Sequence, residues 1–205
     1  MSGRTQTDTV NAKKEHPKLT EHEYRFCPRC GAELVRQFRH GRVRPVCPVC
    51  GYIQYLNPAP AVAVVLLQGN DVLLVRRRYS PRKGYWSLPA GFVEWDEDIR
   101  TAAVREVKEE TNCDVEVGEV LGAFSAFDDP RTHVVLIVFA GRLKAGSLRA
   151  GDDATEARFF PLDALPEDMA FAVHRQVLEE VREKRRNVAA EELNQVLCGT
   201  DSSRE

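Results

Sequence analysis

The pattern of apolar and polar residues divides the chain into a polar start, a short cysteine-bearing segment and a longer region typical of a folded domain. Residues 1–23 lack any hydrophobic period, which predicts a disordered tail. Apolar runs at 61–67 and 72–77 flank Gly69, Asn70 and Asp71, and predict two strands joined by a tight turn. The proline-containing junction 57–60 precedes them and stiffens the chain there.

Beyond the turn-rich stretch 79–91, the pattern predicts helices and strands in alternation. A helix over 96–110 is followed by strands at 115–127, 133–143 and 158–160 and by a helix over 167–185. This order predicts an α/β fold, a mixed sheet covered by helices on both sides. The expected divisions are a tail at 1–23, a cysteine module at 24–57, a main domain at 58–187 and a C-terminal tail at 188–205, the last as a frayed helix at most.

Composition narrows the class of protein. The 205 residues are 43% hydrophobic and 29% charged, which is typical of a globular protein. No apolar run is long enough to span a bilayer and the start has no apolar signal core, so we expect a cytosolic protein. The net charge of −2 predicts no global attraction to nucleic acid or acidic membranes.

Four of the six cysteines have the spacing of metal ligands. Two Cys-x2-Cys pairs separated by sixteen residues predict two tight turns whose thiolates meet at one tetrahedral zinc, and four sulfur ligands make that zinc structural. Gly31 and Gly51 follow the pairs and permit the positive φ of such turns. Cys113 and Cys198 stand alone. The expected zinc ligands are Cys27, Cys30, Cys47 and Cys50.

The role of this module stays open between two hypotheses. It could be a ribbon that packs on the main domain or on a second subunit. Alternatively, its arginines, with Phe26 and Phe38, could hold phosphates or stack bases, as in single-strand binders. The segment from Tyr24 to Gly51 has one acid, Glu33, against six arginines: Arg25, Arg29, Arg36, Arg39, Arg42 and Arg44.

The helix over 96–110 carries the candidate chemistry. Its buried face should be formed by Ile99, Ala102, Ala103 and Val107. Three glutamates, Glu106, Glu109 and Glu110, fall in or beside that same stripe. Clustered carboxylates on a half-buried face repel one another, and a divalent cation with oxygen ligands, Mg2+ or Mn2+, would neutralise them. The alternative is a solvated acidic surface, against which the alignment with apolar residues counts.

Neighbouring residues support this helix. Arg105 is suited to neutralise and orient Glu106, or to contact phosphate. Asp96 is the expected N-terminal cap, and Glu97 is expected to be structural first and catalytic second. Asn112 stands where a left-handed C-terminal cap belongs.

These residues resemble the signature of the Nudix hydrolase family, G-x5-E-x7-R-E-U-x-E-E-x-G-U, where U is bulky and apolar. Asn112 replaces the second glycine and Cys113 fills the last apolar position. The matching residues are Gly91, Glu97, Arg105, Glu106, Val107, Glu109 and Glu110. The resemblance implies a Nudix α/β/α sandwich that hydrolyses nucleoside diphosphates linked to another group with Mg2+ or Mn2+. It assigns metal binding to the three glutamates, one of them also a base, and an assisting backbone carbonyl to Gly91.

The substrate is less constrained than the reaction. Arg77 and Arg78, at the end of a strand, are candidates to clamp phosphate. A cysteine ribbon before a Nudix domain resembles NADH pyrophosphatases, but their S-Q-P-W-P-F-P-x-S stretch is missing. The segment 159–166 resembles zinc-ribbon enzymes acting on ADP-ribose or FAD, and Pro130 lies near a proline that marks ADP-ribose hydrolases. ADP-ribose or FAD, hydrolysed to AMP and a phosphorylated product, is therefore the expected substrate.

Other hypotheses remain from other classes. The chain could be an NADH or NAD-cap pyrophosphatase, an enzyme of capped RNA, or a nucleotide-sensing regulator that binds nucleic acid through its arginine-rich module. A homodimer is expected from the resemblance alone. The acidic loop with Asp152, Asp153 and Glu156 is expected to be a solvated turn rather than the source of a general base, and His133 and His174 to be structural.

Overall fold

The computed structural model describes residues 23–129, 132–151 and 153–198, and for 189–198 the backbone only. The chain separates into two compact units, Met1–Asn57 and Pro58–Glu205. The division falls where Pro58 and Pro60 stiffen the backbone. No helix in the described ranges is long and apolar enough to cross a membrane.

The first unit is built on a hairpin of β1 (Val35–Arg39) and β2 (Arg42–Val46). His40 and Gly41 form its two-residue loop, and both have positive φ, 49° and 78°. Two central residues of positive φ define the type I′ turn, whose twist matches that of paired strands. The hairpin thus holds two cysteine turns, which are closed by hydrogen bonds from Gly31 N to Cys27 O and from Gly51 N to Cys47 O.

The cysteine sulfurs of this unit converge. Cys27 Sγ lies 3.5 Å from Cys50 Sγ, and Cys30 Sγ lies 3.4 Å from Cys47 Sγ. All four lie within 4.8 Å of one another and none is in a disulfide. Zn–S bonds of about 2.3 Å in a tetrahedron place sulfurs roughly 3.8 Å apart. The predicted four-cysteine metal site is therefore present in its geometry.

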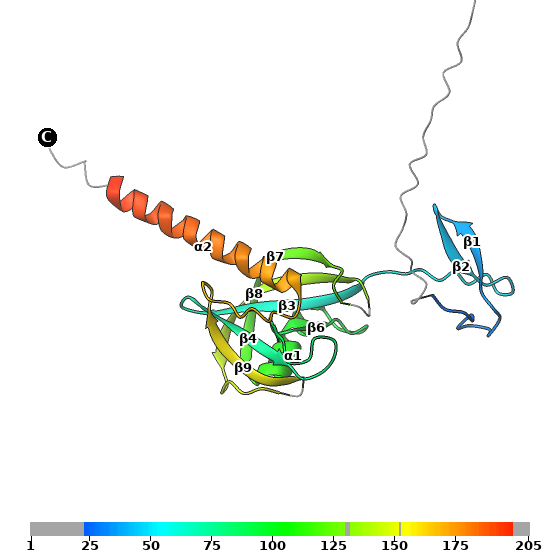
Figure 1. Cartoon of the computed structure of the whole chain (residues 1–205), viewed down its shortest axis with the longest axis horizontal. Helices are drawn as coiled ribbons and strands as arrows, with labels where there is room; N and C mark the ends of the chain where they lie inside the picture. The colour runs from blue at the N-terminus through cyan, green and yellow to red at the C-terminus, as the bar shows by residue number, and fades with distance from the viewer. Residues whose placement is uncertain (1–22, 130–131, 152, 199–205) are drawn as a thin grey trace, which may run out of the picture. The chain divides into compact units, whose positions relative to one another are not determined.

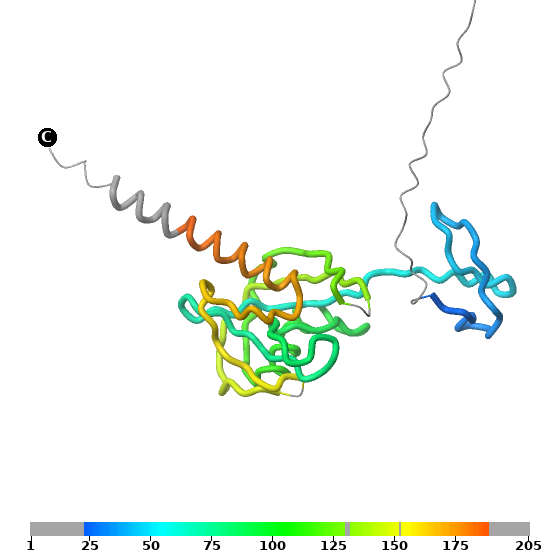
Figure 2. The backbone as a smooth tube through the Cα atoms, viewed as in Figure 1, coloured from blue at the N-terminus to red at the C-terminus, as the bar shows by residue number. Residues whose placement is uncertain are grey.

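The second unit is organised around its longest buried strand, β3, which pairs in parallel with β8 and antiparallel with β6. Beyond β8 the antiparallel β7 completes one side, and the β3–β4 turn leads to the other, where β4 pairs with β5 and β9. In Figure 2 the yellow segment that contains β9 runs beside β4, with which it pairs. The strands are β3 (Ala59–Gln68), β4 (Asp71–Arg77), β5 (Trp86–Ser87), β6 (Ala90–Phe92), β7 (Asp114–Ala126), β8 (Val134–Ala145) and β9 (Ala154–Pro161).

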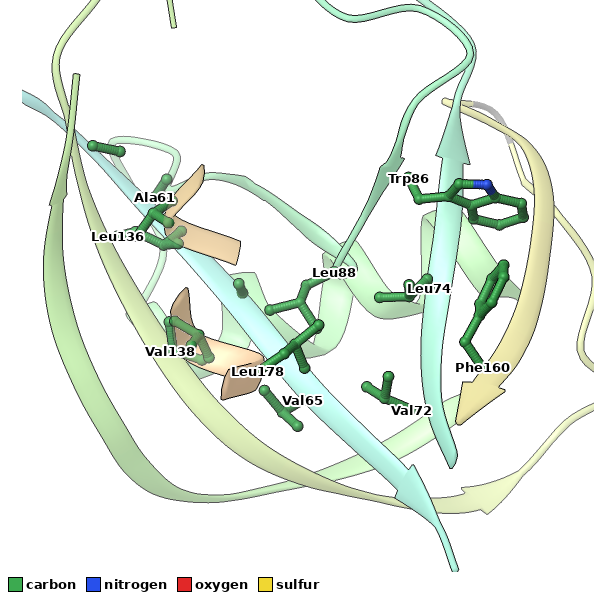
Figure 3. Close-up of a cluster of buried hydrophobic side chains, with 14 of the residues drawn as sticks. Ala61, Val65, Val72, Leu74, Trp86, Leu88, Leu136, Val138, Phe160 and Leu178 are labelled. Atoms are coloured by element: carbon green, nitrogen blue, oxygen red, sulfur yellow. The ribbon is translucent and has the colours of Figure 1, made fainter. Parts of the chain in front are cut away.

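Alternation along β3 creates two cores. One face carries Ala61, Ala63 and Val65 and packs under α2 (Ala172–Cys198), as Figure 3 shows for Val65 and Leu178. The opposite face carries Val62, Val64 and Leu66 and packs against α1 (Ile99–Thr111). Successive side chains of a strand point to opposite faces, so one apolar strand supports both helices. The predicted mixed sheet between helices is thereby confirmed (Figure 1).

The C-terminal helix differs most from the prediction. It begins at Ala172 rather than at residue 167 and continues to Cys198. Residues before it are held extended, because Trp86 N donates to Asp168 O and Ala170 N donates to Trp86 O. Its first turn is capped from far along the chain, since Ala172 N donates to a carboxylate oxygen of Asp128 at 2.8 Å. Both partners are distant in sequence, so the local pattern could not place this start.

Two smaller differences concern the stretch that leads to α1. The turn-rich region contains β5 and β6, which are too short for a periodic pattern to reveal. The N-terminal cap is Asp98 rather than Asp96, because its side chain accepts the hydrogen bond of Arg100 N at 2.8 Å. The predicted C-terminal cap is confirmed: Asn112 has a φ of 60° and its N–H donates to Lys108 O.

Cys47→Ser should lower the zinc content of the purified protein well below the expected value of about one ion per chain, because the site loses one of four thiolates. Cys113→Ala is the matched control, since Cys113 is buried outside the cluster. Zinc content is measured by elemental analysis after dialysis. Equal zinc retention in Cys47→Ser and the parent protein would contradict a four-thiolate site.

Candidate active site

Helix α1 is fixed by the sheet beneath it. Ala102, Ala103 and Val107 are fully buried against the β3 face that carries Val62 and Val64. This packing confirms the predicted apolar stripe and sets the rotation of the helix. Glu106 and Glu110 follow Ala103 and Val107 by three positions each, so they lie along the same side of the helix.

Glu110 is the buried acid of this helix. The residue is only 7% exposed, and its Oε2 accepts a hydrogen bond from Ala90 N at 3.0 Å. The pKa of Glu110 is raised to about 8, mainly by burial and also by the charge of Glu106, although the bond from Ala90 and the charge of Arg77 oppose the shift. Without a cation, the carboxylate form is therefore costly in this position.

Glu106 lies one turn earlier and faces the same edge. Its side chain is 14% exposed, and burial raises its pKa against the opposing hydrogen bond and charge of Arg105. A Cβ on Gly91 would lie 2.1 Å from Glu106 Cδ. The glycine at this position of β6 is thus required for space, because any side chain would displace the carboxylate.

Arg105 connects the neighbouring acids. Its Nε donates to Glu97 Oε2 at 3.0 Å, and its NH1 donates to Glu106 at 2.7 Å and to Glu109 at 3.1 Å. The arginine lowers the pKa of Glu97, whose carboxylate also accepts the N–H of Glu94. Glu97 accordingly has a structural position here. The side chain of Glu109 is 53% exposed on the outer side of Arg105.

A cavity of about 390 Å³ opens in front of Glu106 and Glu110. A smaller cavity of about 80 Å³ adjoins it and shares Arg77, Ala90, Gly91 and Phe92. The larger cavity is polar at its base, where both carboxylates lie, and it also contains Tyr79, Glu94 and Asp153.

Asp153, which was expected from the sequence to lie in a solvated turn, lines the larger cavity. The loop before β9 packs on the end of α1: Gly151 N donates to Glu110 O at 3.0 Å, and a Cβ on Gly151 would lie 1.6 Å from Glu109 O. This contact brings Asp153 to the cavity, where its charge raises the pKa of both Glu106 and Glu110. Asp152 lies outside the described residues, and Glu156 pairs with Arg76 instead.

The two arginines proposed to clamp phosphate occupy different surroundings. Arg77 lines both cavities, its Nε donates to Pro81 O, and its guanidinium lies 5.2 Å from the ring centre of Phe171. Arg78 donates instead to Ala154 O at 2.7 Å and to Gly151 O at 3.4 Å. Arg78 thus secures the loop that carries Asp153 and does not line either of these two cavities, so its contact with phosphate stays a prediction.

The smaller cavity combines an apolar wall with acids. Its wall includes Leu136 and Phe171, and Asp128 and Asp129 also line it. His174 is buried beside them, accepts the N–H of Leu88 on Nδ1 at 3.1 Å, and has its pKa lowered to about 4 by burial. The expected structural role of His174 therefore agrees with its neutral, hydrogen-bonded state. Pro130, proposed as a marker of ADP-ribose hydrolases, lies outside the described residues.

The acidic cavity fits a hard divalent cation in the chemistry of its donors. Glu106, Glu110 and Asp153 supply only oxygen atoms, and their mutual repulsion in a desolvated position is relieved by positive charge. Within the described parts of the chain, however, only the four cysteines bring three or more ligand atoms within 4.8 Å of one another. The carboxylates would have to converge on the ion, and Glu109 would have to turn from Arg105.

Comparison with known families assigns both units. Residues 57–181 match the NUDIX domain family, and residues 25–56 match the family described as Nudix N-terminal. A crystal structure of a NUDIX hydrolase from Nitrosomonas europaea superposes with a TM-score of 0.72 at 34% identity, covering 80% of this chain and 93% of that one.

Two kinds of curated relative carry different names. The ADP-ribose pyrophosphatase of Methanocaldococcus jannaschii is 45% identical over 130 residues, 63% of this chain and 76% of that protein. The NAD-capped RNA hydrolase NudC of Pseudomonas aeruginosa is 38% identical over 145 residues, 69% of this chain but only 49% of that protein. The family match covers more than half of the chain and includes every residue of the acidic cavity. The chain therefore belongs to the Nudix hydrolase family, in the branch that carries a zinc-ribbon segment before the NUDIX domain.

Proposed function

We propose that this protein is a pyrophosphohydrolase, dependent on Mg2+ or Mn2+, that cleaves ADP-ribose or a similar ADP-containing compound such as FAD. The observation that carries the proposal is the pair of desolvated carboxylates, Glu106 and Glu110, that share one cavity with Asp153. A divalent cation held there would offset charge on the diphosphate. The name of the relative from Methanocaldococcus jannaschii supports ADP-ribose.

The adjoining cavity supports a nucleoside at one end of the substrate. Its apolar wall and Phe171 suit the face of a base, and the carboxylates of Asp128 and Asp129 suit the amino and hydroxyl donors of a nucleoside. Arg77 lies where the two cavities meet, so its positive charge is placed for the diphosphate between them. The two adjoining cavities therefore support a substrate with a nucleoside in one and a diphosphate beside the acids of the other.

The reaction requires a proton acceptor and carboxylates that are held in position. Water attacks one phosphorus atom, the bridging P–O bond breaks, and a carboxylate of the cavity accepts the proton of the attacking water. The products from ADP-ribose are AMP and ribose phosphate. Arg105 keeps Glu106 in place through its bond to that carboxylate and its link to Glu97. Gly91 has no side chain and therefore leaves room for the carboxylate of Glu106.

Purified protein with Mg2+ or Mn2+ should hydrolyse ADP-ribose faster than NADH, with AMP as one product identified by chromatography. FAD, NADH and NAD-capped RNA complete the panel. Failure to hydrolyse every member would overturn the proposed reaction, and a clear preference for NADH would overturn the proposed substrate.

Glu106→Gln and Glu110→Gln should each reduce kcat by about 10²-fold or more, because each removes a charge that holds the cation or accepts the proton. Gly91→Ala should have a similar effect, since its Cβ would displace Glu106. Glu119→Gln, an exposed change of the same kind on β7, is the matched control and should retain full activity. Near-normal kcat in Glu110→Gln would remove that residue from the site.

Glu110→Gln should also stabilise the protein freed of divalent cations. Because the folded-state pKa of about 8 exceeds the ordinary value of 4.5, the parent protein loses stability as pH rises through this interval. The variant lacks that titration, so its melting temperature in EDTA should exceed that of the parent by a margin that grows between about pH 5 and about pH 8.5. Each kcal/mol corresponds to about 2–4 °C. Saturating Mg2+ should raise the melting temperature of the parent more than that of the variant; a constant margin across pH would refute a buried, titrating Glu110.

A second candidate is hydrolysis of NAD-capped RNA, the activity in the name of the relative from Pseudomonas aeruginosa. The observation that favours it is the arginine-rich ribbon, which a free dinucleotide does not require. Against it stands the coverage, since this chain spans about half of that relative. The same substrate panel separates the two candidates, because NAD-capped RNA releases a 5′-monophosphate RNA.

A further inference from the structure

One face of the ribbon hairpin concentrates positive charge. Along the β1–β2 register, Arg39 stands opposite Arg42, and Gln37 stands opposite Arg44. Paired residues share a face, as do residues two apart on one strand, so the three arginines lie on the same side. We call Arg39, Arg42 and Arg44, with His40 and Tyr55 beside them, the arginine face.

The two acids of the ribbon are paired with other arginines. Glu23 accepts from Arg36 at 2.6 Å, and Glu33 lies 3.4 Å from Arg25. In the described parts of the chain no carboxylate forms an ion pair with the arginine face. Arg39 donates to the backbone oxygen of Phe38, and Arg44 donates to that of Arg39. Like charges directly opposite each other on a hairpin destabilise it, and an anion between them removes that repulsion.

Net charge supports the same conclusion. Residues 23–57 contain six arginines and two glutamates, which gives 6 − 2 = +4. Four thiolates with one zinc ion contribute −4 + 2 = −2, so the metal-loaded ribbon keeps +2, whereas the rest of the chain carries −2 − 4 = −6. The arginine face is therefore a local cationic site in a weakly acidic protein.

Flat side chains stand next to these charges. The Arg44 guanidinium lies 4.7 Å from the ring centre of Tyr55, which is 46% exposed. The ring of His40 lies nearly parallel to that of the same tyrosine, with 6.2 Å between centroids and 8° between planes, and its Nδ1 lies 2.8 Å from Tyr55 Oη. This hydrogen bond joins the two rings edge to edge in nearly parallel planes, so together they form a flat surface that suits a nucleobase.

We infer that the arginine face binds single-stranded nucleic acid, with phosphates on Arg39 and Arg42 and a base stacked on the Tyr55 and His40 rings. Single strands are favoured over duplex because stacking requires bases that are free of a partner strand. They are favoured over an acidic peptide because carboxylates offer nothing to the exposed rings. The inference concerns binding alone, so it stands or falls independently of the proposed hydrolysis.

The test is fluorescence anisotropy of the full-length protein with a labelled oligoadenylate RNA of about 12 nucleotides, within the usual site size of such modules. Arg39→Gln/Arg42→Gln/Arg44→Gln should weaken binding by about tenfold or more and reduce the salt slope by about 1.4, from roughly 0.7 for each of the two lost phosphate contacts. The matched control is Arg25→Gln/Arg29→Gln/Arg36→Gln, which removes the same charge from other parts of the ribbon and should bind nearly as the parent does.

Tyrosine variants separate stacking from charge. Tyr55→Ala should weaken RNA binding about tenfold. Tyr55→Phe, which keeps the ring, should bind RNA nearly as the parent protein does. Zinc content and hydrolysis of free ADP-ribose should be unchanged in all these variants. Equal weakening by the two arginine triples, tighter binding of duplex RNA than of the single strand, or equal competition by polyglutamate would each overturn the inference; the last would indicate an acidic protein partner.

Discussion

The chemistry of the second unit depends on a carboxylate that the fold removes from water. Glu110 occupies the buried stripe of α1 because Val107 and its neighbours fix the rotation of that helix against β3. Its hydrogen bond from Ala90 holds it at the edge of the sheet. A side chain whose charge is disfavoured by burial is stabilised by positive charge, so the packing of an apolar core favours the cation that we propose for this site.

The remaining parts of the site are arranged around that buried acid by backbone contacts. The loop before β9 reaches it because Gly151 leaves no side chain between loop and helix. Arg78 secures the same loop, and Arg105 joins Glu106 to the segment that precedes the helix. The distant loop before β9 and the segment that precedes α1 are thereby both held on that helix.

The sequence predicted the sheet between helices, the four cysteines and the acids on α1, since each follows from local spacing. It missed Asp153, because only the packing of Gly151 on the helix shows that this loop faces the site. It also placed the start of α2 too early, since that start is set by contacts with Trp86 and Asp128. Periodicity reports the face of an element, whereas loop placement depends on residues that the chain brings together from afar.

The carboxylate of Asp128 belongs to two structures at once. It lines the smaller cavity, and it caps the N-terminus of α2 by accepting the hydrogen bond of Ala172 N. Any exchange at this position that alters the choice of ligand also removes a helix cap, and such a cap is worth about 1 kcal/mol. A substitution of Asp128 therefore changes the lining of this cavity and the anchoring of the C-terminal helix at the same time.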